Sequence, residues 1–147
     1  MIQKSNQTWT PPPNLKISDW ADHFRRLSPE SSAEAGAWRT DRAPYQKEIM
    51  DSFNDPDIQR IVFMKSAHVE AIDILLNVIC YYIDQDPAPI LIMQPTLQMA
   101  QAFSKDRLAT MIRDSEKIRD CVKDPRSRDS GNTVLSKKFA GGNLNIV

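Results

Sequence analysis

A turn between two apolar segments holds the residues of this chain that are best suited to binding phosphate. It reads KSAHVEAID over residues 65–73, after the apolar run 61–64 and before the apolar, periodic segment 74–83. A turn that joins a strand to a helix is where nucleotide-binding proteins cradle phosphate groups, with a lysine and backbone N–H groups as donors. This turn contains no glycine. The residues alone therefore leave open whether it binds phosphate or has lost that ability.

Two pairs of a strand and a helix are expected to position the turn and a second loop. Residues 58–64 contain consecutive β-prone apolar side chains, which predicts a buried strand, and residues 69–83 are long and periodic enough for a helix. A second short strand is predicted at 90–93, followed by a helix over 96–108 with Thr96 as its N-cap. Strands that alternate with helices predict an α/β fold with a parallel sheet flanked by helices.

The rest of the chain adds a tail, more helices and a hairpin. Three consecutive prolines predict a flexible, extended arm over residues 1–16. Helices are also predicted at 18–27, 44–54 and 111–122, and a hairpin at 133–147 around Ala140-Gly141-Gly142. Only two strands of clear parallel type are present, whereas an open α/β sheet normally has more. We therefore expect the N-terminal part of a domain and not the whole of it.

Composition and charge limit the possible classes of protein. The chain has 147 residues, of which 41% are hydrophobic, so one domain with a real core is expected. Nineteen basic and nineteen acidic residues cancel, so any DNA contact would come from a local patch. Cys80 and Cys121 match no metal-ligand spacing, and no metal site is predicted. No apolar run reaches the ~20 residues of a membrane span, and a signal peptide is not evident, so we expect a cytoplasmic protein without a membrane partner.

Three long stretches of the sequence resemble one family, in order along the chain. They read LSPESSAEAGAWRTDRAPYQKEIMD, VFMKSAHVEAIDILLNVICYYIDQDPAPILIMQPTLQMAQAFSKDRLATMIRD and DPRSRDSGNTVLSKKFAGGNL. From about residue 19 to residue 147, the chain is similar to the N-terminal ATPase part of phage terminase large subunits of the lambda gpA type. The resemblance implies a partial ATPase domain of the P-loop NTPase kind over residues 17–147, in the cytoplasm of the host cell.

The resemblance also implies a part of a DNA-packaging motor. In that family an ATPase domain uses ATP and Mg²⁺ to drive double-stranded DNA into the procapsid, and a nuclease domain cuts the DNA. The small terminase subunit and the portal are the implied protein partners. This chain stops at Val147, before the acidic Walker B strand, so we expect a fragment that is inactive alone. Two alternatives are a non-catalytic binding module or decoy that docks on terminase or portal components, and an enzyme completed by another chain.

The Walker A-like turn departs from the family pattern, which is Lys-Ser-Ala-Gln-Val-Gly-Lys-Thr. Its eight positions are Lys65, Ser66, Ala67, His68, Val69, Glu70, Ala71 and Ile72. Glu70 stands in place of glycine and brings a negative charge, and two like charges ~4 Å apart repel by about 1 kcal/mol in water. Ala71 removes a lysine, and Ile72 lacks the hydroxyl that holds Mg²⁺. We expect residual nucleotide contact through Lys65 and no efficient hydrolysis.

Two further segments are candidate contacts by the same resemblance. Tyr45 and Gln46 are similar to the motif that reads adenine, because an amide both donates and accepts hydrogen bonds. The alternative is a surface glutamine on a helix. Pro95, Thr96 and Gln101 resemble a loop that helicase-like motors place against a nucleic-acid backbone. The alternative there is an ordinary turn from a strand to a helix with a threonine cap.

Overall fold

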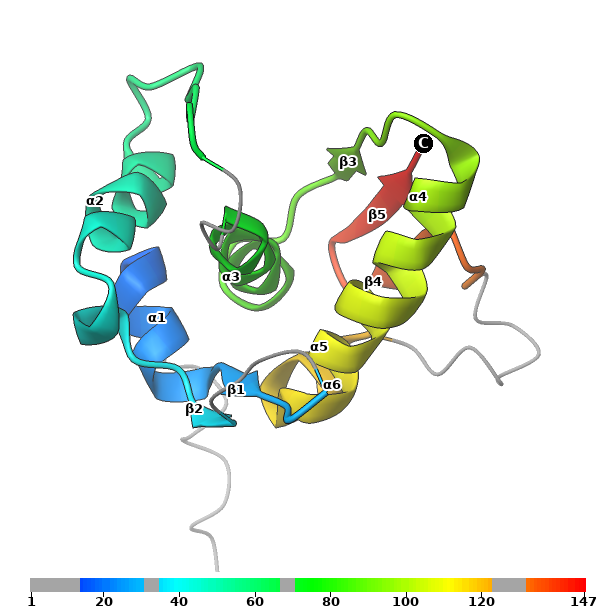
Figure 1. Cartoon of the computed structure of the whole chain (residues 1–147), viewed down its shortest axis with the longest axis horizontal. Coiled ribbons are helices and arrows are strands. Elements are labelled where there is room, and N and C mark those ends of the chain that lie inside the picture. The colour runs from blue at the N-terminus through cyan, green and yellow to red at the C-terminus, as the bar shows by residue number, and fades with distance from the viewer. Residues whose placement is uncertain (1–13, 31–34, 67–70, 123–131) are drawn as a thin grey trace, which may run out of the picture.

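The structure is a computed structural model that describes residues 14–30, 35–66, 71–122 and 132–147. Residues 1–13 of the predicted tail lie outside these ranges, and so do residues 123–131, which precede the predicted hairpin. The described chain is a mixed α/β structure, in which one long helix lies between a group of helices on one side and a second helical run with a small sheet on the other (Figure 1).

The first group consists of short helices that pack on α3 (Ala71–Asp84). Helix α1 (Ile17–Phe24) and helix α2 (Tyr45–Asp51) contact each other and both contact α3. A 3-10 turn (Thr40–Arg42) precedes α2, and another (Ser52–Asn54) follows it. Because α3 is surrounded by other elements, most of its side chains are buried, and Ile79 and Cys80 are fully so. The helices predicted at 44–54 and 69–83 are thus confirmed within the described residues.

The second helical run follows strand β3 (Ile90–Ile92) and precedes the hairpin. Helix α4 (Leu97–Ala102), a π-helical turn (Phe103–Leu108) and helix α5 (Ala109–Asp114) continue one another, and α6 (Glu116–Cys121) comes after a break at Ser115. The predicted helices at 96–108 and 111–122 are confirmed, with the break near Ser115 in the second.

The N-terminal helix is shorter than predicted. It was expected over 18–27, but Arg25 has extended backbone angles, and Arg26–Leu27 forms strand β1, which pairs with β2 (Gly36–Ala37) in an antiparallel ribbon. The helix begins at Ile17, whose backbone N–H donates to the side chain of Asn54.

The three-stranded sheet is mixed and not purely parallel. Its strands are β3 (Ile90–Ile92), β4 (Ser136–Phe139) and β5 (Gly142–Ile146), in the spatial order β3-β5-β4. The predicted hairpin supplies β4 and β5, with Gly141 at φ +86° in its turn, and β5 pairs in parallel with β3. Ile92, Leu144 and Ile146 join the buried cluster that contains Phe103 and Leu108. An antiparallel hairpin thus forms most of a sheet that was expected to be parallel.

The predicted buried strand at 58–64 is wrong. Residues 58–66 form neither helix nor strand, and the side chains of Val62 and Met64 are 81% and 95% exposed. A central strand needs hydrogen-bonding neighbours and a covered face. No strand in the described part of the chain pairs with this segment, so β-prone composition alone does not make it a strand.

Candidate functional site

The Walker A-like turn is described at its two ends. Lys65 and Ser66 are exposed, and the Lys65 ammonium lies 3.3 Å from its neighbour's carbonyl oxygen. Ala67, His68, Val69 and Glu70 fall outside the described residues. The lysine side chain therefore makes a local contact with the next residue of the chain.

The far end of the turn is the start of α3, where an isoleucine and an aspartate stand in the first turn. Ile72 is 44% exposed and carries no polar atom. Asp73 is the acidic residue of this first helical turn. A carboxylate there interacts favourably with the positive end of the helix dipole and opposes the binding of another anion. The N-terminus of α3 thus has its own negative charge and no hydroxyl at position 72.

A buried arginine approaches the same aspartate. Arg25 is 2% exposed, and its Nη2 lies 3.8 Å from Oδ1 of Asp73. Nη1 donates to the backbone oxygen of Arg26, while Nε has no acceptor among the described atoms. The sequence did not single out Arg25, because the N-terminal helix was expected to continue through it to residue 27. Its burial follows from the strand that begins immediately after it.

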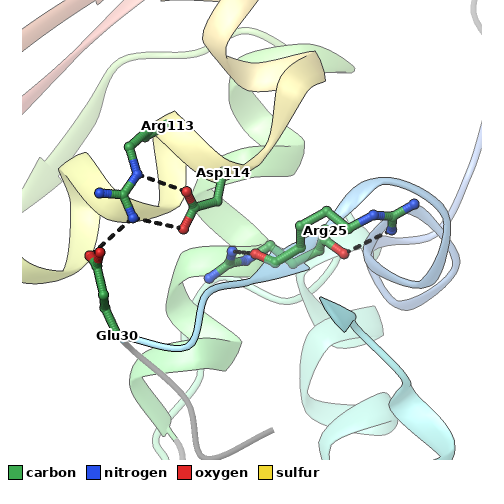
Figure 2. A network of polar contacts seen from close by, with 5 residues as sticks. Arg25, Glu30, Arg113 and Asp114 are labelled. Atoms are coloured by element: carbon green, nitrogen blue, oxygen red, sulfur yellow. Dashed lines mark hydrogen bonds and ion pairs between the residues drawn. The ribbon is translucent and has the colours of Figure 1, made fainter. Parts of the chain in front are cut away.

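Figure 2 shows a second group of charges close to Arg25. Arg113 donates from Nε to Oδ1 of Asp114 at 2.8 Å and from Nη2 to Oε2 of Glu30 at 3.0 Å. The hydrogen bond from Arg113 holds the pKa of the Asp114 carboxyl below its usual value, with a smaller effect from Ser28. Both partners raise the pKa of Arg113. The group ties α5 to the segment after β1, which is a structural role.

The adenine-contact candidates lie on α2 with opposite exposure. Tyr45 is 53% exposed, whereas Gln46 is completely buried. The amide nitrogen of Gln46 is 3.4 Å from the Tyr45 hydroxyl, and its Oε1 accepts from no described donor. One turn later, Met50 is also fully buried and its sulfur accepts from the amide of Asn77 on α3. Gln46 therefore lies on the buried side of α2 together with Met50, and Tyr45 is the member of the pair that reaches the surface.

The DNA-contact candidates lie at and beyond the start of α4. Pro95, Thr96 and Gln101 are exposed. The backbone N–H of Met99 donates to Oγ1 of Thr96 at 3.2 Å, so the threonine caps the helix as predicted. Figure 1 shows α2 and α4 on opposite sides of α3, so the adenine-contact and DNA-contact candidates do not come together.

The described residues contain neither a metal-binding cluster nor a membrane-spanning helix. Within the ranges that the structure describes, no group of three or more His, Cys, Asp and Glu side chains could hold a metal ion. Of the helices in those ranges, none has the length and apolar character required to cross a bilayer.

Comparison with known proteins gives a consistent result. The family model described as "Phage terminase large subunit gpA, ATPase domain" matches residues 32–147. The chain is 30% identical over 132 residues to the terminase large subunit of Escherichia phage lambda, and 30% identical over 131 residues to that of Enterobacteria phage P21. These alignments cover 90% and 89% of this chain, and the chain spans 20% of the length of each relative. No solved structure matches. The family model confirms the resemblance: the chain belongs to the phage terminase large subunit gpA family, within its ATPase domain.

Proposed function

We propose that this chain is a part of the ATPase domain of a phage DNA-packaging motor and that it does not hydrolyse ATP by itself. The observation that carries the second half of this proposal is Ile72, which stands in the first turn of α3 where the family pattern has a hydroxyl. The first half rests on the family match through residues 32–147, which includes the turn.

The family's name implies an adenine nucleotide, and Mg²⁺ would accompany its phosphates. The described residue at the position where the family pattern holds that ion does not fit it. Mg²⁺ requires oxygen ligands in an octahedral arrangement, and Ile72 supplies none. Asp73 stands in the first turn of α3 and lies 3.8 Å from the Arg25 guanidinium. Gln46 is completely buried, so its amide is not presented to a base. The site therefore offers Mg²⁺ no hydroxyl at position 72 and offers adenine no exposed amide at position 46.

Several further features that the family match implies form part of the same proposal. They are a P-loop NTPase-like fold, a domain over residues 17–147 after an N-terminal tail, and a place in the host cytoplasm. Double-stranded DNA, the portal and the small terminase subunit are the proposed partners of the assembled motor. The support for these features is the family match, together with the order of β3, α4 and the hairpin along the chain.

ATP hydrolysis by the purified chain tests the proposal directly. We expect no release of phosphate from Mg-ATP above the buffer background. The variant Glu70→Gly/Ala71→Lys/Ile72→Thr restores the family pattern at three positions, and we expect it to bind a fluorescent ATP analogue more tightly than the unchanged chain. The same variant with Lys65→Ala is the control and should lose that gain. Hydrolysis by the unchanged chain that Lys65→Ala abolishes would contradict the proposal.

A further inference from the structure

The outer edge of β3 directs unpaired backbone groups away from the sheet. The carbonyl of Ile92 accepts from Val147, and the N–H of Gln94 donates to Val147, so these groups point toward β5. Successive residues of a strand point their backbone groups to opposite sides. Leu91 and Met93 consequently direct their N–H and C=O groups to the other edge, where no described strand pairs with β3.

The side chains of the same two residues are exposed and apolar. In the register of β3 with β5, Ile90 and Ile92 lie beside Leu144 and Ile146, which are buried. Leu91 alternates to the opposite face and is 63% exposed, and Met93 is 77% exposed. A parallel strand pair is normally covered on both faces. Here one face of β3 carries apolar side chains that no described element covers.

The two edges of this sheet differ in how well they are protected against pairing with a further strand. The β4 edge carries Lys137 and Lys138, and Phe139 forms an antiparallel bridge with Val122, so that edge has charge and a covering segment. The β3 edge reads Ile-Leu-Ile-Met, with neither a charged residue nor a bulge in the strand. Charged residues and covered ends are how proteins prevent an edge strand from pairing. Only the β3 edge has the features of one that receives a further strand.

A second exposed apolar segment also lacks a partner among the described residues. Residues 61–64 read Ile-Val-Phe-Met, lie outside any helix or strand, and expose Val62 and Met64 almost completely. Large apolar residues exposed in series mark an interaction site. The described chain thus has both a strand edge without a partner and a β-prone run without a partner.

We propose that the β3 edge docks a β-strand from another part of a terminase large subunit, namely from the part of that polypeptide outside the region matched here. The inference rests on the proposed function. The occupant follows from length: the matched region is 20% of each relative, so the family polypeptide holds much more chain than the described sheet uses. Main-chain hydrogen bonds to Leu91 and Met93 supply the affinity, and burial of their side chains adds to it.

Co-expression tests the docking without nucleotide. The probe is the phage lambda terminase large subunit from which the segment that aligns with this chain is deleted, carrying an affinity tag. We expect this chain to co-elute with the tagged probe. The full-length lambda subunit contains its own copy of that segment, and we expect it to retain little of this chain.

Substitutions at the edge identify the surface. Met93→Pro removes an outward N–H without removing a bond to β5, and we expect about a tenfold drop in co-elution, as the loss of one hydrogen bond predicts. Met93→Ala keeps the N–H and is the matched control, with a smaller drop. Leu91→Lys should act like Met93→Pro. Val134→Lys changes an exposed apolar residue ahead of β4, on the other side of the sheet, and should have no effect.

Several outcomes would overturn the docking proposal. They are recovery of the probe without this chain, failure of the probe to become soluble on co-expression, and equal co-elution of the wild-type chain and Met93→Pro. A dimer of the chain alone that Met93→Pro dissociates, seen by sedimentation, would identify a second copy as the occupant and would also overturn it. ATP hydrolysis by the chain alone would contradict only the proposed lack of activity, so the two failures are distinguishable.

Discussion

The indole N–H of Trp20 donates a 2.8 Å hydrogen bond to Oδ2 of Asp84, the last residue of α3. Trp20 is completely buried, and the Asp84 carboxylate is 8% exposed. The same carboxylate accepts from the amide of Gln85 at 2.7 Å and lies 3.7 Å from the ammonium of Lys117. One carboxylate thereby joins α1, α3 and α6.

We expect Trp20→Phe to lower the free energy of unfolding by about 2 to 4 kcal/mol. A hydrogen bond to a charged acceptor contributes about 1.5–3 kcal/mol, and some packing is lost as well. A double-mutant cycle with Asp84→Ala, followed by urea denaturation, should give a coupling energy of about 1.5–3 kcal/mol. Trp38→Phe is the control, because its indole donates to a neutral hydroxyl, that of Thr40, and should cost less. Additive effects of Trp20→Phe and Asp84→Ala would contradict the expected coupling.

Local sequence signals located most helices and the hairpin correctly. Ala140-Gly141-Gly142 predicted a turn, and Gly141 adopts a positive φ there, which glycine permits at little cost. Thr96 predicted a helix start and does cap α4. Both signals depend on a few neighbouring residues. The failed strand at 58–64 depends instead on a partner strand distant in sequence, and composition carries no information about that partner.

The candidate site shows the same limit at the level of single side chains. Gln46 was expected at the surface or against adenine, yet it is completely buried. The sequence did contain a signal, because Gln46 precedes the apolar Met50 by four residues and so shares its helix face. Arg25 had no such signal, since its burial depends on where α1 ends and β1 begins.

The buried contact of Arg25 with Asp73 predicts an asymmetric response to mutation. Asp73→Asn leaves a buried guanidinium without its nearest carboxylate, and we expect a loss of about 1 to 3 kcal/mol in the free energy of unfolding. This is below the ~3–5 kcal/mol of a fully buried pair, because Asp73 is 20% exposed. The exposed pair of Arg39 and Asp41 is the control: Arg39→Met should leave the urea midpoint unchanged. Equal effects of the two substitutions would show that burial does not matter at Arg25.

Burial predicts different reactivity for the two cysteines. Complete burial raises the pKa of the Cys80 thiol to about 12, while partial burial raises that of Cys121 to a lesser degree, with Asp84 adding to it. Only the thiolate is nucleophilic, so Cys80 remains in the unreactive form across pH 7–9. We expect iodoacetamide to modify Cys121 first in the folded chain, with a rate that increases with pH, and to modify both in urea. Peptide mass spectrometry measures each site, and labelling of Cys80 at the rate of Cys121 in the folded chain would contradict its burial.

Substitutions at Thr96 can separate its two predicted roles, which are capping of α4 and contact with a DNA phosphate. Its Oγ1 accepts from the Met99 N–H, which leaves the hydroxyl hydrogen free to donate to a phosphate. Thr96→Ala should lower the free energy of unfolding by about 1 kcal/mol through loss of the cap. Thr96→Asp keeps a capping acceptor at the helix N-terminus but repels phosphate, so we expect wild-type stability with weaker DNA binding.

Urea denaturation and fluorescence anisotropy with labelled duplex DNA, at several salt concentrations, measure the two effects of substitution at Thr96 separately. Thr96→Ser is the control and should match the wild-type chain in both assays. If Thr96→Ala leaves the free energy of unfolding unchanged, the cap contributes nothing to stability. If Thr96→Asp binds DNA as the wild-type chain does, the threonine does not contact the phosphate backbone, and its role at the start of α4 is capping alone.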